Sequence, residues 1–169
     1  TVLVISPKLN VKSVRELVDL AKSRPGKLNY GYSSSSPLAV MEMFRQKTGI
    51  SMLGVPYKGS APAMQALMAG EIDVMFGGAL NTVPAVKQGV IRALATAGSK
   101  RTSLLPDLPT VAEAGVAGFA ADSWNGVFAP AGTPADVVAR LGGEISRAMS
   151  AQEVRTAISS EGGIAVGSS

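Results

Sequence analysis

Histidine and cysteine are both absent from this sequence of 169 residues. Without histidine the chain cannot form a Ser–His–Asp or Cys–His triad, an imidazole proton shuttle or a histidine-based zinc site. Without cysteine it has no disulfide and no thiol chemistry, although that absence does not assign a redox compartment. The two absences argue against most hydrolases, and we expect no catalytic residue, no metal and no cofactor.

Aromatic residues and long apolar runs are also scarce. Aromatics make up 5% of the chain, against 46% hydrophobic and 17% charged residues, so aliphatic and alanine side chains must fill the core of an ordered domain. No apolar run approaches the roughly 18 residues that a membrane-spanning helix needs. Neither a methionine nor a basic segment precedes Thr1, so no signal peptide is visible and the sequence reads as an interior fragment or a trimmed chain.

The net charge of +4 arises from 16 basic and 12 acidic residues spread along the chain, and the densest cluster is only "SKRTS" at 99–103. Nucleic-acid-binding proteins usually concentrate positive charge on one face and add aromatic stacking groups. We therefore expect a mildly basic, solvated surface and no nucleic-acid partner. An anionic small ligand is compatible with this charge.

Strand-like and helix-like segments alternate at least four times. The runs "TVLVIS" and "EIDVMF" are typical of buried strands. Ser13 and Glu16 form an S-x-x-E capping box before an amphipathic helix. Further helices are expected at about 36–47, 60–69 and 134–149. The alternation predicts an α/β fold with a largely parallel sheet flanked by helices.

Three loops between expected strands and helices are rich in Gly, Ser or Asn and contain no carboxylate. They are residues 31–37, 56–60 and 77–82. In parallel α/β sheets, ligands bind at the carboxyl ends of the strands, where helix N-termini offer free N–H groups and partial positive charge. The sequence therefore predicts an anion site formed by these loops.

The four consecutive serines allow two interpretations. They offer hydroxyl donors and N–H groups at the positive end of a helix, which suits an anion. Alternatively, Ser36 simply caps the helix with Pro37 at its first position. A catalytic serine is not expected, because no base is available and no G-x-S-x-G motif is present.

Other candidate ligand residues have equally plain structural alternatives. Lys58 could pair with a carboxylate or be a solvated turn residue, and Tyr57 could line a cleft or belong to the core. Trp124, the single tryptophan, could line a cleft or hinge or be buried. The predicted ligand contacts are Ser33, Ser34, Ser35, Ser36, Tyr57, Lys58, Gly59, Gly77, Gly78, Asn81 and Trp124.

Four segments carry a resemblance to a known family: "NYGYSSSS", "VPYKGSAPAMQALMAGEIDVMF", "RALATAGSKRTSLLPDLPTVAEAGV" and "SWNGVFAPAGTPADVVARL". Here the chain resembles the Bug-type receptors, which are the extracytoplasmic, periplasmic solute-binding proteins of tripartite tricarboxylate transporters. The resemblance covers nearly the whole chain. It implies two α/β lobes of the type II periplasmic-binding-protein kind that close on a small carboxylate, without enzymatic activity, and that meet the membrane components of a transporter.

The resemblance also implies a division of the chain. Residues 1–8 would be a strand crossing into the second lobe, 9–121 that lobe, and 122–169 the return strand and the C-terminal part of the first lobe. The loop "GYSSSSP" is about two residues shorter than the family's glycine-containing loop and has Leu38 near the family's histidine. The ligand therefore stays open among di- and tricarboxylates, amino acids and aromatic acids.

Two other classes of function remain open at this point. A ligand-sensing effector domain of a transcriptional regulator shares this fold type and would need a helix-turn-helix upstream. An enzyme could use Ser, Lys58 or Asp73, and substituting either of the last two should then abolish the rate and spare the affinity. Asp73 lies in an apolar strand with no second carboxylate near it, which favours a surface-facing or capping role.

Overall fold

The computed structural model describes residues 1–122, 124, 126–160 and 163–167. The chain divides into two compact units, Thr1–Ser123 and Trp124–Ser169, which are described separately below. Six positions of the predicted 122–169 segment lie outside the described residues, namely 123, 125, 161, 162, 168 and 169.

The first unit is built around a five-stranded sheet with the strand order β3-β2-β4-β1-β5. β2 (Asn29–Tyr32) pairs in parallel with both β3 (Leu53–Pro56) and β4 (Val74–Gly77). β1 (Val2–Ile5) lies between β4 and β5 (Arg92–Thr96) and runs antiparallel to both. Four strands therefore share one direction, as the largely parallel prediction requires, and β1 makes the sheet mixed.

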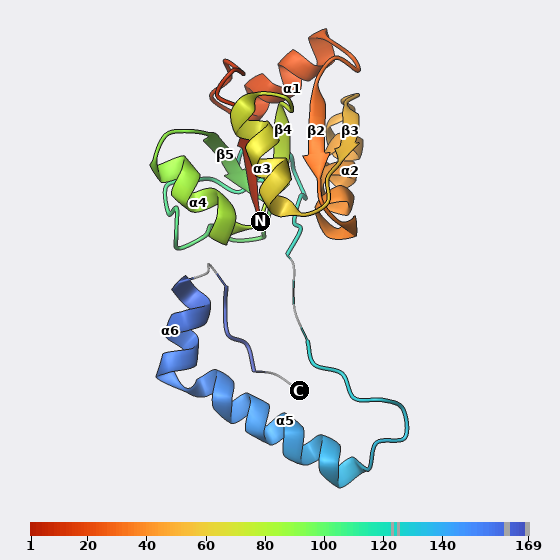
Figure 1. Cartoon of the computed structure of the whole chain (residues 1–169), viewed down its shortest axis with the longest axis vertical. Helices are drawn as coiled ribbons and strands as arrows, with labels where there is room; N and C mark the ends of the chain where they lie inside the picture. The colour runs from red at the N-terminus through yellow and green to blue at the C-terminus, as the bar shows by residue number, and fades with distance from the viewer. Residues whose placement is uncertain (123, 125, 161–162, 168–169) are drawn as a thin grey trace. The chain divides into compact units, whose positions relative to one another are not determined.

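Helices cover both faces of this sheet (Figure 1). They are α1 (Val14–Ser23), α2 (Ser35–Thr48), α3 (Ser60–Ala69) and α4 (Ala79–Lys87). Side chains of α1 and α2 belong to one buried cluster, and those of α3 belong to a second cluster against which α4 packs. The first unit is thus a three-layer α/β/α arrangement, and its α2 and α3 lie close to the predicted 36–47 and 60–69.

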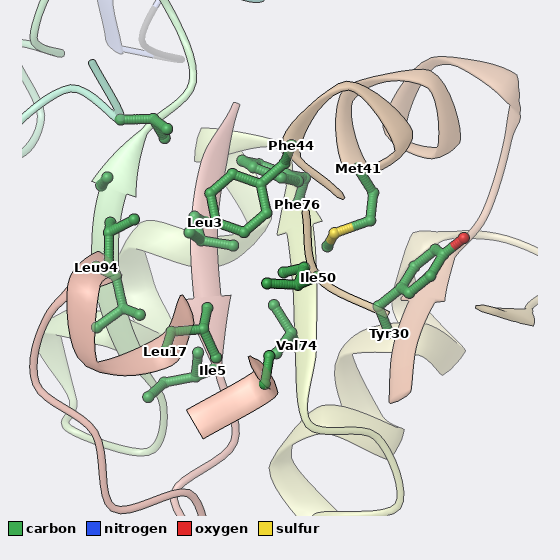
Figure 2. Close-up of a cluster of buried hydrophobic side chains, with 14 of the residues drawn as sticks. Leu3, Ile5, Leu17, Tyr30, Met41, Phe44, Ile50, Val74, Phe76 and Leu94 are labelled. Atoms are coloured by element: carbon green, nitrogen blue, oxygen red, sulfur yellow. The ribbon is translucent and has the colours of Figure 1, made fainter. Parts of the chain in front are cut away.

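The central strand β1 separates the two clusters through its alternating side chains. Leu3 and Ile5 enter the cluster of α1 and α2, whereas Val2 and Val4 enter the cluster of α3, and all four are fully buried. Figure 2 shows Leu3 and Ile5 in the same cluster as Phe44 of α2. A strand buried on both faces explains why "VLVI" is apolar throughout.

Local sequence signals set the ends of several helices. Ser13 caps α1 by accepting a hydrogen bond from the Glu16 N–H at 3.1 Å, and the Glu16 carboxylate accepts one from the Lys12 N–H at 2.8 Å. Gly70 ends α3 with a left-handed φ of 70°, a conformation that favours glycine. These elements follow the sequence prediction because the signals act within one turn of the helix.

Asp73 has a structural role at the amino ends of β2 and β4. Its carboxylate accepts a hydrogen bond from the Asn29 N–H at 2.9 Å, and its own N–H donates to Asn29 Oδ1 at 2.9 Å. The Asn29 amide also donates to the Glu71 carbonyl at 3.3 Å. This reciprocal pairing extends the contact between the two strands beyond their ladder.

The second unit contains two helices, α5 (Ala135–Ser150) and α6 (Gln152–Ser160). α5 agrees closely with the predicted helix at 134–149. Val137, Val138 and Leu141 on α5 are all at least 41% exposed. Within the residues that the structure describes, no helix combines the length and the apolar character that crossing a bilayer requires.

Candidate ligand-binding site

Three helix N-termini of the first unit lie at one edge of its sheet (Figure 1). β2, β3 and β4 are mutually parallel, so their carboxyl ends lie at the same edge. Each strand is followed within four residues by the start of a helix, α2, α3 or α4 respectively. The structure thus brings together the three loops that the sequence predicts to hold an anion. We call this edge, formed by residues 31–37, 56–60 and 77–82, the ligand edge.

These three N-termini differ from that of α1 in having no protein cap. In the described part of the chain, no side-chain hydrogen bond caps α2, α3 or α4, and their first turns contain no acidic residue. α1, by contrast, has the Ser13 cap and Glu16 in its first turn. Uncapped N–H groups at the positive end of a helix dipole form a favourable environment for a carboxylate.

Helix α2 begins two residues earlier in the serine run than the capping interpretation requires. Ser34 is the N-cap residue, with extended φ and ψ of −163° and 177°, and Ser35 and Ser36 are the first helical residues. The prediction that Ser36 caps the helix with Pro37 in its first position is therefore wrong. Ser33 is half-buried and Ser34 to Ser36 are exposed, so these hydroxyls face solvent at the edge of the sheet.

Two hydrogen bonds connect the three loops. The Tyr57 N–H donates to the Tyr32 carbonyl at 2.9 Å, which joins the loops after β2 and β3. The Asn81 side-chain amide donates to Ser60 Oγ at 3.2 Å, which joins the first turns of α3 and α4. Asn81 thus lies beside the start of α3, and hydrogen bonds connect the three loops; its contact with ligand stays a prediction.

Ser60 is a residue of this surface that the predicted ligand set omits. The signal that could have identified it is a pattern shared by two helix starts, Ser35-Ser36-Pro37 in α2 and Ser60-Ala61-Pro62 in α3. In both helices the proline is the third residue, where its missing N–H costs no intrahelical hydrogen bond. Each helix therefore presents its first amides and a serine hydroxyl at the same position.

The three predicted ligand glycines differ in whether their position would tolerate a side chain. Gly59 has a φ of 113°, a conformation that L side chains rarely adopt. At Gly77, an added Cβ would lie 2.4 Å from Thr82 Cγ2, so the start of α4 can approach the strand only because this residue lacks a side chain. At Gly78 nothing lies within 4 Å of an added Cβ, and φ is an ordinary −63°.

The larger predicted side chains have different positions. Tyr57 is half-buried against the α3 cluster, and its ring carbon Cε2 lies 3.4 Å from where a Cβ on Gly31 would stand. Lys58 is exposed in the loop before α3. Trp124 belongs to the second unit, is 75% exposed and lies beside Phe128 with ring centroids 6.1 Å apart. It is not buried in a core, and its contact with ligand stays a prediction.

A polar cluster fixes α2 to the sheet. The Tyr30 hydroxyl of β2 donates to Glu42 Oε1, and Arg45 Nη1 donates to both Glu42 oxygens at 2.6 and 2.8 Å. The guanidinium also lies 5.8 Å from the centre of the Tyr30 ring. The hydrogen bond from Tyr30 lowers the pKa of the Glu42 carboxyl, as does Arg45, against an opposing effect of burial.

Replacing Tyr30 by phenylalanine should make the protein less stable at pH 7, by about 1 kcal/mol, because Glu42 loses a hydrogen bond to its charged form. A carboxyl with a lowered pKa stabilises the fold above its ordinary value of 4.5, and this stability disappears as pH falls through the lowered pKa. The difference between Tyr30→Phe and the parent in urea unfolding should therefore shrink from pH 7 to pH 3. A difference that is equal at both pH values would contradict this linkage.

Two concave pockets of the first unit lie away from the ligand edge. One of about 630 Å³ is lined by residues of α1, the C-terminus of α2 and the turn at 114–117. The other, of about 450 Å³, is lined by the segment after β1, the end of α4 and the start of β5. Neither pocket is lined by a predicted ligand residue.

The comparisons with known proteins agree with this geometry. The chain is 37% identical over 94% of its length to the UPF0065 protein in the tcbD-tcbE intergenic region of a Pseudomonas species, of which it covers 48%. Among solved structures it resembles Rpa4515 from R. palustris with adipate, at 35% identity and a TM-score of 0.86, covering 95% of this chain and 55% of that one. It also resembles MatC from Rhodopseudomonas palustris with bound malate, at 34% identity and a TM-score of 0.83, with the same coverage.

This chain spans about half the length of these relatives. The likeness confirms the predicted α/β periplasmic-binding-protein fold. Residues 1–166 match the model of the TctC family, which is described as the tripartite tricarboxylate transporter family receptor. The match includes the three loops at the ligand edge, and the matched family is one of receptor proteins. The chain therefore belongs to the TctC family of tripartite tricarboxylate transporter receptors.

Proposed function

We propose that the protein carrying this chain is an extracytoplasmic solute-binding protein that captures a small organic carboxylate and delivers it to the membrane components of a tripartite transporter. Residues 9–121 would form the second lobe, 1–8 the strand that crosses into it, and 122–169 the return strand and the C-terminal part of the first lobe. The observation that carries the proposal is the edge at which three uncapped helix N-termini meet without a carboxylate.

Each part of this edge has a chemical role in the proposal. The first amides of α2, α3 and α4 and the serine hydroxyls donate hydrogen bonds to carboxylate oxygens, and Lys58 adds positive charge. Closure of a second lobe over the ligand would exclude water and strengthen these interactions. The structurally similar proteins carry adipate and malate, two dicarboxylates, which supports this ligand class for the present chain.

An enzymatic role for Lys58 and Asp73 together has no geometric support. Lys58 follows the carboxyl end of β3, whereas Asp73 precedes the amino end of the parallel neighbouring strands and is hydrogen-bonded to Asn29. The two side chains therefore lie at opposite edges of the sheet. Asp73→Asn should leave ligand affinity unchanged, because its role is structural.

Titration calorimetry of the full protein with adipate, malate, citrate and benzoate tests the proposal, with adipamide as a neutral control. We expect at least one acid to bind and the diamide not to bind. Ser35→Ala and Asn81→Ala should each weaken the binding of that acid by about 10- to 150-fold, since a hydrogen bond to a charged group contributes about 1.5–3 kcal/mol. Ser51→Ala is the matched control, because Ser51 is exposed and precedes β3 at the opposite edge.

Two results would count against the proposal. If the diamide binds as well as the acid, the site does not recognise carboxylate. If Ser35→Ala and Asn81→Ala bind the acid like the Ser51→Ala control, the helix N-termini are capped by water alone and the ligand binds elsewhere.

A further inference from the structure

The pocket of about 630 Å³ at the C-terminal end of α2 is separate from the ligand edge. α2 has 14 residues, so its C-terminus lies about 20 Å from the serines at its start. The volume lies within the range of roughly 300–1,000 Å³ that is usual for small-molecule sites. None of the residues assigned above to carboxylate binding lines it.

The floor of this pocket is aliphatic. Val14 and Val18 of α1 are four residues apart and so lie on one face of the helix, and Val116 lies opposite them in the turn after β5. Val14 and Val116 are 1% and 8% exposed and belong to the main core cluster, so only their outermost atoms border the pocket. Val18 is only partly buried, so it offers more of its side chain to an apolar group.

The rim of the pocket carries three cations and no acid. Arg15, Lys22 and Lys47 line it, and none of its lining residues is a carboxylate. Lys47 Nζ lies 3.5 Å from where a Cβ on Gly118 would stand, so this ammonium extends from α2 towards the turn.

The neighbouring acids do not neutralise this rim. Arg15 makes only a 3.9 Å contact with Asp19, and both side chains are at least 69% exposed. The Glu16 carboxylate is turned to the Lys12 N–H. In the described part of the chain, neither Lys22 nor Lys47 takes part in an ion pair.

We propose that this pocket is a second binding site, which takes a small amphipathic anion with a carboxylate head and an aliphatic body. The body would lie on the valine floor, and the head would be shared by the three cations of the rim. The Thr48 hydroxyl does not take part in binding the head, because it donates to the Phe44 carbonyl at 2.6 Å. Exposed ion pairs are individually weak, so the affinity depends on both parts of the ligand.

Methyl NMR of the full protein, titrated with octanoate, hexanoate, octanamide and inorganic phosphate, tests this site. Octanoate should shift the methyl resonances of Val14, Val18 and Val116, and leave those of Leu80, in the first turn of α4, unchanged. Hexanoate, which is two CH₂ groups shorter, should bind about 15-fold more weakly, since each buried CH₂ contributes about fourfold. Octanamide and phosphate, each lacking one half of the ligand, should also bind at least tenfold more weakly.

The double variant Lys22→Gln/Lys47→Gln should raise the Kd for octanoate about tenfold. Lys87→Gln is the matched control, because Lys87 is the exposed last residue of α4 and does not line the pocket. An unchanged melting temperature shows that both variants are folded.

Three results would overturn the second site. If octanoate and octanamide bind equally well, the site does not recognise the charge of the head. If phosphate binds as well as octanoate, the site does not recognise an aliphatic chain. Shifts at Leu80 without shifts at the three valines would place octanoate at the helix N-termini instead. Carboxylate binding at the ligand edge is tested with other ligands and other variants, so either proposal can be disproved while the other stands.

Discussion

Replacing Phe44 by alanine is expected to lower the free energy of unfolding by about 3–5 kcal/mol, the cost usual for deleting a buried aromatic ring. Phe44 is fully buried. Its ring meets Phe76 and Phe119 edge-on, with centroids 5.9 and 6.0 Å away, and Phe76 stacks on Phe119 at 6.1 Å. Figure 2 shows Phe44 with Phe76 and with Leu3 of the central strand in the same buried cluster.

The cost is large because three elements lose a shared contact. Phe44 comes from α2 and Phe76 from β4, while Phe119 follows the turn after β5. In a chain with only 5% aromatic residues, the remaining aliphatic neighbours cannot fill the cavity without moving the helix. Because α2 also carries Ser35 and Ser36 at its start, we expect the variant to bind carboxylate less well.

Urea unfolding of the full protein, followed by circular dichroism, measures this loss. Gln46→Ala is the matched control, since Gln46 is exposed on the same helix and its substitution should change stability by less than about 0.5 kcal/mol. A loss below about 1 kcal/mol for Phe44→Ala would show that the cluster collapses around the missing ring. The position of α2 would then not depend on this contact.

Replacing Gly77 by alanine is expected to destabilise the protein by about 1–3 kcal/mol, the usual cost of overpacking a well-packed site. The new methyl group would lie 2.4 Å from Thr82 Cγ2. Thr82 cannot move away easily, because it is fully buried and its hydroxyl donates to the Gly78 carbonyl at 2.8 Å. Relief of the clash would shift the first turn of α4, which carries Asn81.

A second substitution separates this clash from other effects of alanine. Thr82→Ser removes Cγ2 and keeps the hydroxyl, so the double variant Gly77→Ala/Thr82→Ser should regain most of the stability lost by Gly77→Ala. Gly78→Ala is the neighbouring control for stability, because its added Cβ meets nothing within 4 Å. If both alanine variants lose the same stability, or if Thr82→Ser restores none of it, the close approach at Gly77 does not determine the position of α4.

Much of the secondary structure could be predicted because its signals are local. The Ser13–Glu16 box sets the start of α1, and Gly70 sets the end of α3. The absence of carboxylates from the loops after three strands also pointed to the ligand edge, since residue types decide what charge a helix N-terminus can accept.

The serine run shows where local signals fail. Any of several adjacent serines can supply a cap, and Pro37 fits any position of a first helical turn. Packing decides between these registers: α2 starts at Ser35, with Phe44 in the core and Glu42 bonded to Tyr30. The capping interpretation placed the helix start too late because it considered only the residues next to the proline.

The sequence by itself determined the element types, the apolar strands, the carboxylate-free loops and the exclusion of histidine and cysteine chemistry, because composition and contacts within a few residues decide them. Only the tertiary structure decided the antiparallel direction of β1, because an apolar run such as "VLVI" can pair in either direction. It also decided the meeting of Asn81 with Ser60 and the pocket between α1 and the end of α2. These contacts join residues distant in sequence, and the free energy of packing the whole sheet selects them.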